Sequence, residues 1–205
     1  MTDTDSLEVI AADVRACTRC PLHKSRKNAV PGEGSGISGT YFIGEAPGYH
    51  ENEQGRPFVG AAGQFLTELL ESVGLDRRAV WITNVVRCRP PENRDPLPPE
   101  IAACDVYTQR QLAVLQPKVI VTLGRHAMGQ FLPGESISRV HGQSRRSGEY
   151  VVFPAYHPAA ALHQPSMREA IVADFKKLAE FLEQTPAEPP PAKDEPQPAT
   201  QMSLF

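Results

Sequence analysis

Residues 41–60 read YFIGEAPGYHENEQGRPFVG and set the architecture of this chain. They open with the apolar run Tyr41-Phe42-Ile43 and break at GEAPG, residues 44–48. An apolar run that ends in a Gly/Pro turn predicts a buried strand leading into a loop. In open α/β sheets, ligands bind at such loops, beyond the carboxyl ends of the strands. Here Gly44 lets the backbone come close to a ligand and Glu45 supplies a carboxylate, although the same residues also suit a plain turn.

The second half of this stretch places an aromatic ring on a stiff loop. Phe58 stands between a proline and a glycine in RPFVG, residues 56–60, just before an expected helix. A ring held in this way suits stacking on a flat ligand. The alternative is that Phe58 is an ordinary core residue.

The rest of the chain alternates strands with helices. Three further apolar runs read as strands, at 80–83, 118–123 and 150–155. Helical spacing of apolar residues predicts helices at 6–15, 61–73, 100–115, 125–132 and 166–183. This alternation is typical of an α/β fold, a three-layer α/β/α sandwich around a central four-stranded, mainly parallel sheet.

Polar residues follow the ends of these strands. The four expected strands end at Glu45, Asn84, Gly124 and His157. Because the carboxyl ends of parallel strands meet at one edge of a sheet, we expect three polar side chains to converge there. This convergence indicates a functional site more strongly than any single motif.

Composition excludes some classes of protein. No apolar run is long enough to span a bilayer and the N-terminus lacks a signal-peptide pattern, so we expect a cytoplasmic protein with no membrane partner.

The formal net charge is −3 over 205 residues. The tail accounts for it, because Glu183, Glu188, Asp194 and Glu195 outnumber Lys193 there. Local basic segments at 23–27 and 138–148 are therefore the candidates for binding phosphate.

The chain has four cysteines, Cys17, Cys20, Cys88 and Cys104. Without a secretion signal, a metal site or free thiols are favoured over disulfides. Four thiolates fit either a tetrahedral zinc ion or an iron–sulfur cluster. Buried small hydrophobic residues with an accidental C-x-x-C are the remaining alternative.

Taken together, these motifs resemble the iron–sulfur uracil-DNA glycosylases of family 4. The matching segments are GEAPG (44–48), GRPFVG (55–60), TNVVRCRPP (83–91), HPA (157–159) and the four cysteines in order. The resemblance spans 6–183. It implies a [4Fe–4S] cluster on the four cysteines and a monofunctional enzyme that hydrolyses the N-glycosidic bond of flipped-out uracil in double- or single-stranded DNA, which initiates base excision repair.

The resemblance also implies roles for individual residues. Phe58 would stack on the extruded uracil, Asn84 would read its Watson–Crick edge, and His157 would lie near O2, where negative charge develops. The loop at Glu45 and Ala46 would position the attacking water, with Glu45 either the general base or an orienting group.

Further residues are expected around the base and the DNA. Glu51 is a candidate for excluding the methyl group of thymine. Leu162 is either a wedge that fills the gap left by the flipped base or a core residue. Arg139, Arg145 and Arg146 would contact phosphates. His141, in the same basic segment, is expected to contact DNA or to be structural.

The C-terminal segment is predicted to be a linker that ends in a short binding motif. We expect a glycosylase domain over 1–184 and a disordered proline-rich linker over 185–200. The last five residues, QMSLF (201–205), resemble the motif by which bacterial proteins bind the replication sliding clamp. A monomer associated with the nucleoid is expected.

Two other functions remain open. A non-catalytic iron–sulfur module could bind DNA and recruit repair partners through its tail, but it would need no residue that reads a base edge. A small electron-transfer protein would need no basic segment.

Overall fold

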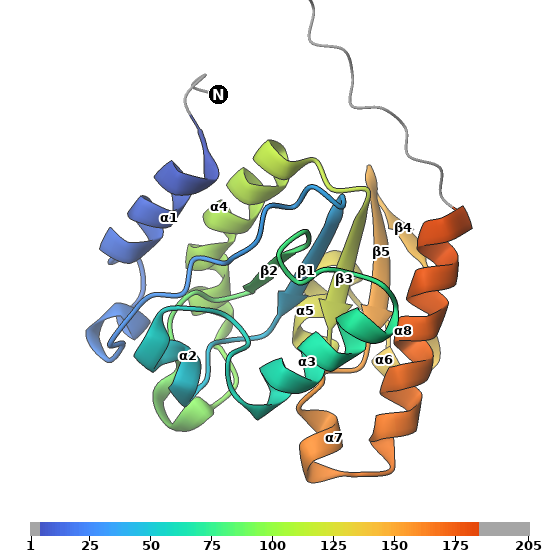
Figure 1. Cartoon of the computed structure of the whole chain (residues 1–205). Coiled ribbons are helices and arrows are strands. Elements are labelled where there is room, and N and C mark those ends of the chain that lie inside the picture. The colour runs from blue at the N-terminus through green and yellow to red at the C-terminus, as the bar shows by residue number, and fades with distance from the viewer. Residues whose placement is uncertain (1–4, 185–205) are drawn as a thin grey trace, which may run out of the picture.

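A five-stranded sheet runs through the middle of the molecule, with its strands in the order β2-β1-β3-β5-β4 (Figure 1). The structure is a computed structural model, and it describes residues 5–184. The expected linker at 185–200 and clamp motif at 201–205 lie outside the described residues. The strands are β1 (Thr40–Gly44), β2 (Trp81–Asn84), β3 (Val119–Leu123), β4 (Arg145–Ser147) and β5 (Tyr150–Ala155).

The four expected strands are parallel to one another and form the core of the sheet. The prediction of four strands was wrong by one. β4 pairs antiparallel with β5 at the edge of the sheet, with Arg145 opposite Val152. It has only three residues, all polar, so no apolar pattern marks it, and its pairing with β5 is what makes it a strand.

Helices cover both faces of the sheet, which confirms the α/β/α prediction (Figure 1). α3 (Ala61–Ser72) and α8 (Met167–Gln184) pack on one face, in a core cluster that includes Phe42. α1 (Leu7–Ala16), α4 (Pro98–Leu115) and α5 (Arg125–Phe131) pack on the other, with Tyr41 and Ile43. Successive side chains of a strand point to opposite faces, and β1 is accordingly buried along its whole length.

Short helices fill the connections between these elements. They are α2 (Tyr49–Gln54), α6 (Ile137–Val140), α7 (Ala160–His163), and the 3₁₀ turns η1 (Pro21–Lys24) and η2 (Pro91–Asn93). α2 and α7 lie at the end of the sheet toward which the parallel strands point, the lower end in Figure 1. They therefore border the predicted site.

The long helices begin and end close to the predicted residues. The Ser6 side chain accepts from the backbone N–H of Val9 and caps α1. In α4, Pro98 occupies the first turn, and Glu100 accepts from the backbone N–H of Leu97. Of the helices within residues 5–184, none combines the length and the apolar character that a membrane crossing requires.

Candidate active site

Two adjoining cavities open beyond the carboxyl ends of the parallel strands. The inner one has a volume of about 220 Å³ and is lined by Ala46, Gly48, Glu51, Phe58, Ala62, Asn84, Asn93, His157 and Ala159. The outer one, of about 620 Å³, shares Ala46, Gly48, Asn93, His157 and Ala159 with it. The predicted convergence of Asn84 and His157 is therefore observed in the structure. Glu45 lines only the outer cavity.

Gly44 and Asn84 lie side by side at the ends of β1 and β2, paired in register. A Cβ atom on Gly44 would stand 2.5 Å from Cζ of Phe58 and 2.6 Å from Oδ1 of Asn84. No real side chain can approach so closely, so the absence of one at Gly44 is what allows the Phe58 ring and the Asn84 amide to share this space.

The Asn84 side chain is buried, and its amide has no hydrogen-bond partner among the described residues. Asn84 is only 2% exposed. Its amide lines the inner cavity, and within residues 5–184 it makes no hydrogen bond. Buried side-chain amides in proteins are nearly always hydrogen-bonded. Asn84 therefore has one acceptor and two donors available to a molecule in the cavity.

The Phe58 backbone adopts an unusual conformation. Its φ is 50°, in the left-handed region that costs a non-glycine residue free energy. Gly63 in α3 packs directly against it, because a Cβ there would lie 1.8 Å from the Phe58 carbonyl oxygen. The loop is thus pressed onto the first turn of α3 with the ring held over the cavity.

Two charged side chains hold this loop. One carboxylate oxygen of Glu51 accepts from the backbone N–H of Val59 at 2.8 Å and of Gly60 at 2.9 Å, while the other accepts from Gly48 at 3.1 Å. On the opposite side, the Arg77 guanidinium donates to the carbonyl oxygen of Pro57 at 2.8 Å.

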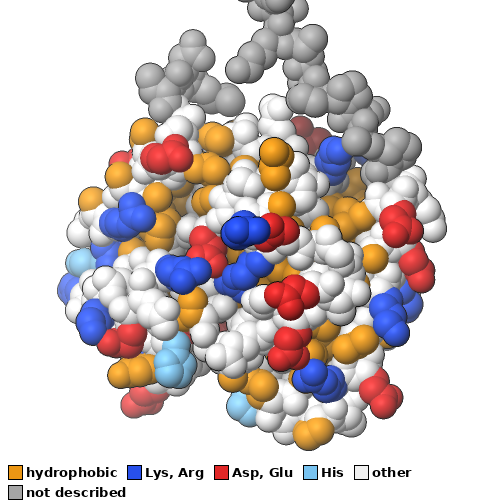
Figure 2. Space-filling model, in the orientation of Figure 1, with side chains coloured by type: hydrophobic (Ala, Val, Ile, Leu, Met, Phe, Trp, Pro, Cys, Tyr) orange, Lys and Arg blue, Asp and Glu red, His pale blue; other side chains and the backbone are white. Residues whose placement is uncertain are grey.

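Arg77 is itself fixed by a second contact. It pairs with Glu33 through two nitrogens, at 2.8 and 3.2 Å, and Glu33 also accepts from Arg56. Figure 2 shows basic and acidic side chains interspersed over the face that carries α2 and α3, without a patch of one sign. Arg56 and Arg77 are both paired with Glu33, so their charges are partly neutralised and do not form a strongly basic patch.

His157 is neutral in this site. Burial lowers its pKa to about 4, and the charge of Glu51 opposes this only in part. Its Nδ1 accepts from the backbone N–H of Ala159 at 3.1 Å, which leaves the proton of the neutral ring on Nε2. The ring stacks beside Phe58, with 5.6 Å between the centroids. His157 can therefore donate one hydrogen bond from Nε2.

Glu45 has acidic and basic neighbours at the outer cavity. The nearest groups are His126, with Nε2 3.8 Å from the carboxylate, and Asp95, which lies 3.1 Å from the same nitrogen. Burial raises the pKa of Glu45, while the positive charge of His126 would lower it. The Glu45 carbonyl oxygen accepts from the backbone N–H of Val86, whereas the Ala46 carbonyl accepts no hydrogen bond within residues 5–184.

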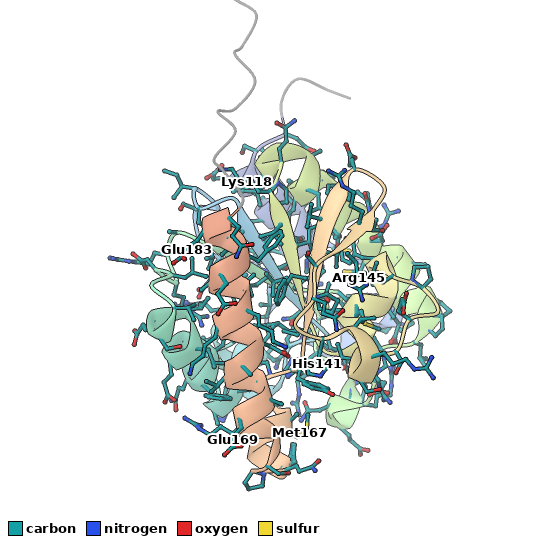
Figure 3. All side chains as sticks on the ribbon, turned by 90° about the vertical axis from the view of Figure 1, so that its right-hand side faces the viewer. Lys118, His141, Arg145, Met167, Glu169 and Glu183 are labelled. Carbon is teal, nitrogen blue, oxygen red and sulfur yellow. The ribbon has the colours of Figure 1, made fainter. Side chains whose placement is uncertain are left out.

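The expected DNA-contacting residues are spread around the rim. Leu162 is half exposed on α7 and belongs to no core cluster within residues 5–184, which favours the wedge over the core interpretation. Arg139 is exposed on α6. Arg145 lies on β4, which runs from the site end toward the other end of the sheet, and Figure 3 shows it well above His141. The expected basic loop at 138–148 is therefore α6 followed by a hairpin strand.

His141 has a structural contact. Its Nδ1 lies 2.7 Å from Oδ1 of Asp174, a buried residue of α8, and its ring packs on Tyr156 with 4.2 Å between the centroids. Figure 3 shows His141 against α8. Asp174 also accepts from the backbone N–H of Tyr156, the residue before His157.

The structure brings the four cysteines together on the α1 and α4 side of the sheet. Cys88 and Cys104 are buried members of one core cluster, and Cys17 and Cys20, which are partly buried, pack against the same cluster. No three of these four sulfur atoms lie within 4.8 Å of one another. Sulfur ligands of one tetrahedral zinc ion stand only about 3.8 Å apart, given Zn–S bonds of about 2.3 Å. The four thiols therefore do not form the compact tetrahedron of a single zinc site in this structure.

Two arginines supply positive charge beside these thiols. Arg26 donates to Sγ of Cys88 at 3.1 Å. Arg87 is 1% exposed, and within the described residues its Nε has no partner and no carboxylate forms an ion pair with it. Burial raises the pKa of Cys88 and of Cys104, and these cations oppose the effect. A buried cation without an acidic partner, as Arg87 is, fits a site that holds a negatively charged group.

Sequence reasoning missed several residues of this region. Arg77, Arg87, Asp95 and His126 all act through partners distant in the sequence. Asn93, in η2, is part of the inner cavity wall and accepts from Arg89. The only available signal was that Arg87 and Asn93 fall in or next to the matching segment at 83–91.

Comparison with known proteins gives a consistent result. The family described as the uracil DNA glycosylase superfamily matches residues 31–183. A protein of Sulfurisphaera tokodaii named type-4 uracil-DNA glycosylase is 50% identical over 187 residues, covering 86% of this chain and 85% of its own length. A type-4 uracil-DNA glycosylase of Thermotoga maritima is 42% identical, covering 88% and 97%. A type-5 uracil-DNA glycosylase of Thermus thermophilus is 34% identical, covering 65% and 68%.

Proposed function

The chain belongs to the uracil DNA glycosylase superfamily, and we propose that it is a monofunctional uracil-DNA glycosylase of the type-4 group. It hydrolyses the N-glycosidic bond of uracil flipped out of DNA and so initiates base excision repair. The observation that carries this proposal is the buried Asn84 amide, which has no hydrogen-bond partner in the described chain and faces the inner cavity.

Asn84 selects the base. Uracil offers an N3–H donor and an O4 acceptor, which an amide can pair with through its oxygen and its nitrogen. Cytosine offers an acceptor and a donor at these positions, so both groups of Asn84 would stay unpaired and buried. Sites that hydrogen-bond their substrate reject a mismatched analogue strongly for this reason. Phe58 provides the apolar face on which the extruded base stacks, and Glu51 shapes the cavity wall toward the 5-position, where thymine has a methyl group.

His157 stabilises the departing base. As the glycosidic bond breaks, negative charge accumulates on uracil O2. A neutral histidine with its proton on Nε2 can donate a hydrogen bond to that oxygen without first taking up a second proton. The buried position strengthens this hydrogen bond. The Nδ1 contact with Ala159 fixes the tautomer.

The outer cavity accommodates the sugar and the attacking water. Ala46 lines both cavities, and its carbonyl oxygen can hold a water molecule beside the anomeric carbon. Glu45 lines only the outer cavity, so its carboxylate orients the loop and stabilises the positively charged sugar from a distance. Leu162 fills the gap left by the flipped base, and Arg139 and Arg145 contact phosphates outside the cavity.

The four cysteines hold a [4Fe–4S] cluster as part of this proposal. Bound there, the cluster supplies a covalent cross-link between the N-terminal segment, the chain after β2, and α4. Arg26 and Arg87 offset its negative charge. We further propose that the protein acts as a monomer in the cytoplasm, on the nucleoid, and that residues 201–205 bind the replication sliding clamp.

The test is excision of uracil from a labelled duplex that holds one U·G pair, followed by alkali cleavage. Wild-type protein should cleave at the uracil. Asn84→Ala and Asn84→Asp should be slower by about 100-fold or more, while Asn93→Ala, at the same cavity but exposed, should retain most of the activity. Absence of cleavage of duplex and single-stranded substrates by iron-loaded wild-type protein would favour the non-catalytic DNA-binding module.

A further inference from the structure

Arg87 lies between the cysteines and the base-reading residue. It is the largest fully buried side chain of the described residues, and it follows Asn84 by three positions. Its guanidinium donates from Nη1 to the carbonyl oxygens of Asn84 and Val85, the latter at 3.1 Å. The side chain therefore folds back over the turn that carries Asn84 out of β2.

The second terminal nitrogen of the guanidinium, Nη2, donates to side chains on one face of α4. Nη2 donates to Oγ1 of Thr108 at 3.1 Å and to Oε1 of Gln111 at 2.9 Å. Cys104, Thr108 and Gln111 are four and three residues apart, a spacing that places them on the same helix face. Cys104 is buried on this helix face, and Cys88 directly follows Arg87 in the chain. The Arg87 side chain thus joins the helix face that carries Cys104 to the turn that carries Asn84.

Both terminal nitrogens of the guanidinium are hydrogen-bonded to protein groups, and only Nε has no partner within the described residues. Gln111 also accepts from the hydroxyl of Tyr41 at 2.9 Å and donates to the carbonyl oxygen of Pro31 at 2.8 Å. Every partner of the guanidinium is neutral. A buried cation with only neutral partners is costly, so its retention next to Cys104 requires negative charge nearby, which a thiolate-bound iron–sulfur cluster provides.

We propose that Arg87 is a positioning residue that couples the cysteine site to Asn84, so that loss of charge at the cysteines releases the turn that presents the base-reading amide. This inference rests on the proposed function. Arg26 provides an internal contrast: it donates to Cys88 and to the Arg15 carbonyl, but no contact joins it to Asn84 in the described chain. Removing Arg26 should affect the cysteine site alone, and removing Arg87 should affect both sites.

Two readouts separate these effects. The first is the rate at which a chelator bleaches the visible absorbance of the iron-loaded protein. The second is the binding preference for a duplex with one 2′-fluoro-deoxyuridine, which resists cleavage, over the same duplex with cytosine at that position. Arg87→Met should lose iron faster than wild type and show a preference weaker by about tenfold or more. Arg26→Met should lose iron faster with its preference unchanged. Arg87→Lys should restore most of the iron retention and of the binding preference, since an ammonium keeps the positive charge and donates hydrogen bonds from its single nitrogen.

A folded Arg87→Met protein with wild-type preference would overturn the coupling, and so would an equal loss of preference in Arg26→Met. If Arg87→Met does not fold, Arg87→Gln takes its place: it should lose iron faster and retain part of the preference, and wild-type behaviour in both readouts would overturn the proposal. Wild-type protein run alongside distinguishes the two proposals. If it binds uracil DNA preferentially but does not excise the base, the proposed function fails and the Arg87 link still stands on the two readouts.

Discussion

Glu51 and Gly60 are joined by a hydrogen bond of 2.9 Å from the backbone N–H of Gly60 to the Glu51 carboxylate. The same oxygen accepts from Val59, and the other oxygen caps α2 at Gly48. One side chain thus fixes both ends of the segment that presents Phe58. The carboxylate that we expect to exclude thymine therefore also holds the loop in place. By holding the loop, it sets the shape of the cavity that receives the base.

Glu51→Gln should destabilise this loop. An amide replaces one acceptor oxygen by a donor that faces a backbone N–H. We expect a decrease of about 1–3 kcal/mol in the free energy of unfolding, measured by urea titration, and a lower kcat/KM for uracil excision. Glu53→Gln, on the same helix, removes only a surface pair with Lys27 and should change neither quantity. Equal behaviour of the two variants would contradict the role of Glu51.

Arg77→Met should loosen the same loop from the other side. It removes the donor to the Pro57 carbonyl and leaves Glu33 partly buried with a single partner. The expected loss of unfolding free energy is about 1–3 kcal/mol, with a rise in KM. The neighbouring Arg78, an exposed residue paired with Asp76, is the matched control, and Arg78→Met should be close to wild type. Urea titration and steady-state kinetics of both variants decide the question.

The titration of His157 should affect stability only in acid. Its pKa is lowered to about 4 from an ordinary 6.5. As the pH falls from about 6.5 toward 4, the unfolded chain takes up the proton before the folded protein does. The free energy of unfolding therefore decreases over this window and has no His157 contribution to its slope at higher pH.

NMR titration of the ring checks this value directly. Urea titrations at about pH 7 and about pH 5 should show a smaller decrease for His157→Gln than for wild type, while the exposed His50→Gln should follow wild type. A pKa near 6.5 for the His157 ring in the folded protein would refute the proposal that burial keeps this side chain neutral.

Removal of the metal should reproduce the loss of a cysteine ligand. Cys88→Ser should lack the visible absorbance of the iron-loaded protein and should lose roughly 3 kcal/mol or more of unfolding free energy, because metal binding contributes to folding. Wild-type protein stripped by a chelator should have the same stability as the variant. Iron content at the wild-type level in purified Cys88→Ser would remove this residue from the ligand set.

Deletion of residues 201–205 should separate recruitment from chemistry. Excision from free oligonucleotides should be unaltered, whereas binding to an immobilised sliding clamp should be lost. A Leu204→Ala, Phe205→Ala double variant keeps the length of the tail and should behave like the deletion. Clamp affinity that survives both changes would show that this segment does not bind the clamp.

The sequence predicted the elements with strong apolar patterns and the residues at their ends. β5 has the predicted bounds, and β2 and β3 differ by one residue at their ends. Asn84 and His157 were found because parallel strands end at a common edge. The fold class is confirmed, and the roles of the site residues stay predictions.

The features that could not be predicted from the sequence depend on contacts between distant segments. β4 is three polar residues, and only its neighbour makes it a strand. α2 is six residues of mostly polar sequence, stabilised by the Glu51 carboxylate at its first turn. An arginine reads as a surface residue, and nothing local reveals that Arg87 is buried or that Arg77 holds Pro57. Side chains that act on other side chains leave no periodic pattern.

The position of the cysteines has a consequence for biosynthesis. All four precede residue 105, whereas β3, which lies between β1 and β5 in the sheet, begins at Val119. Translation is vectorial, and domains begin to fold as they emerge. The nascent chain therefore exposes all four thiols before the sheet can close. Assembly of the proposed cluster on the ribosome-bound chain would then compete with oxidation of thiols that no finished core protects.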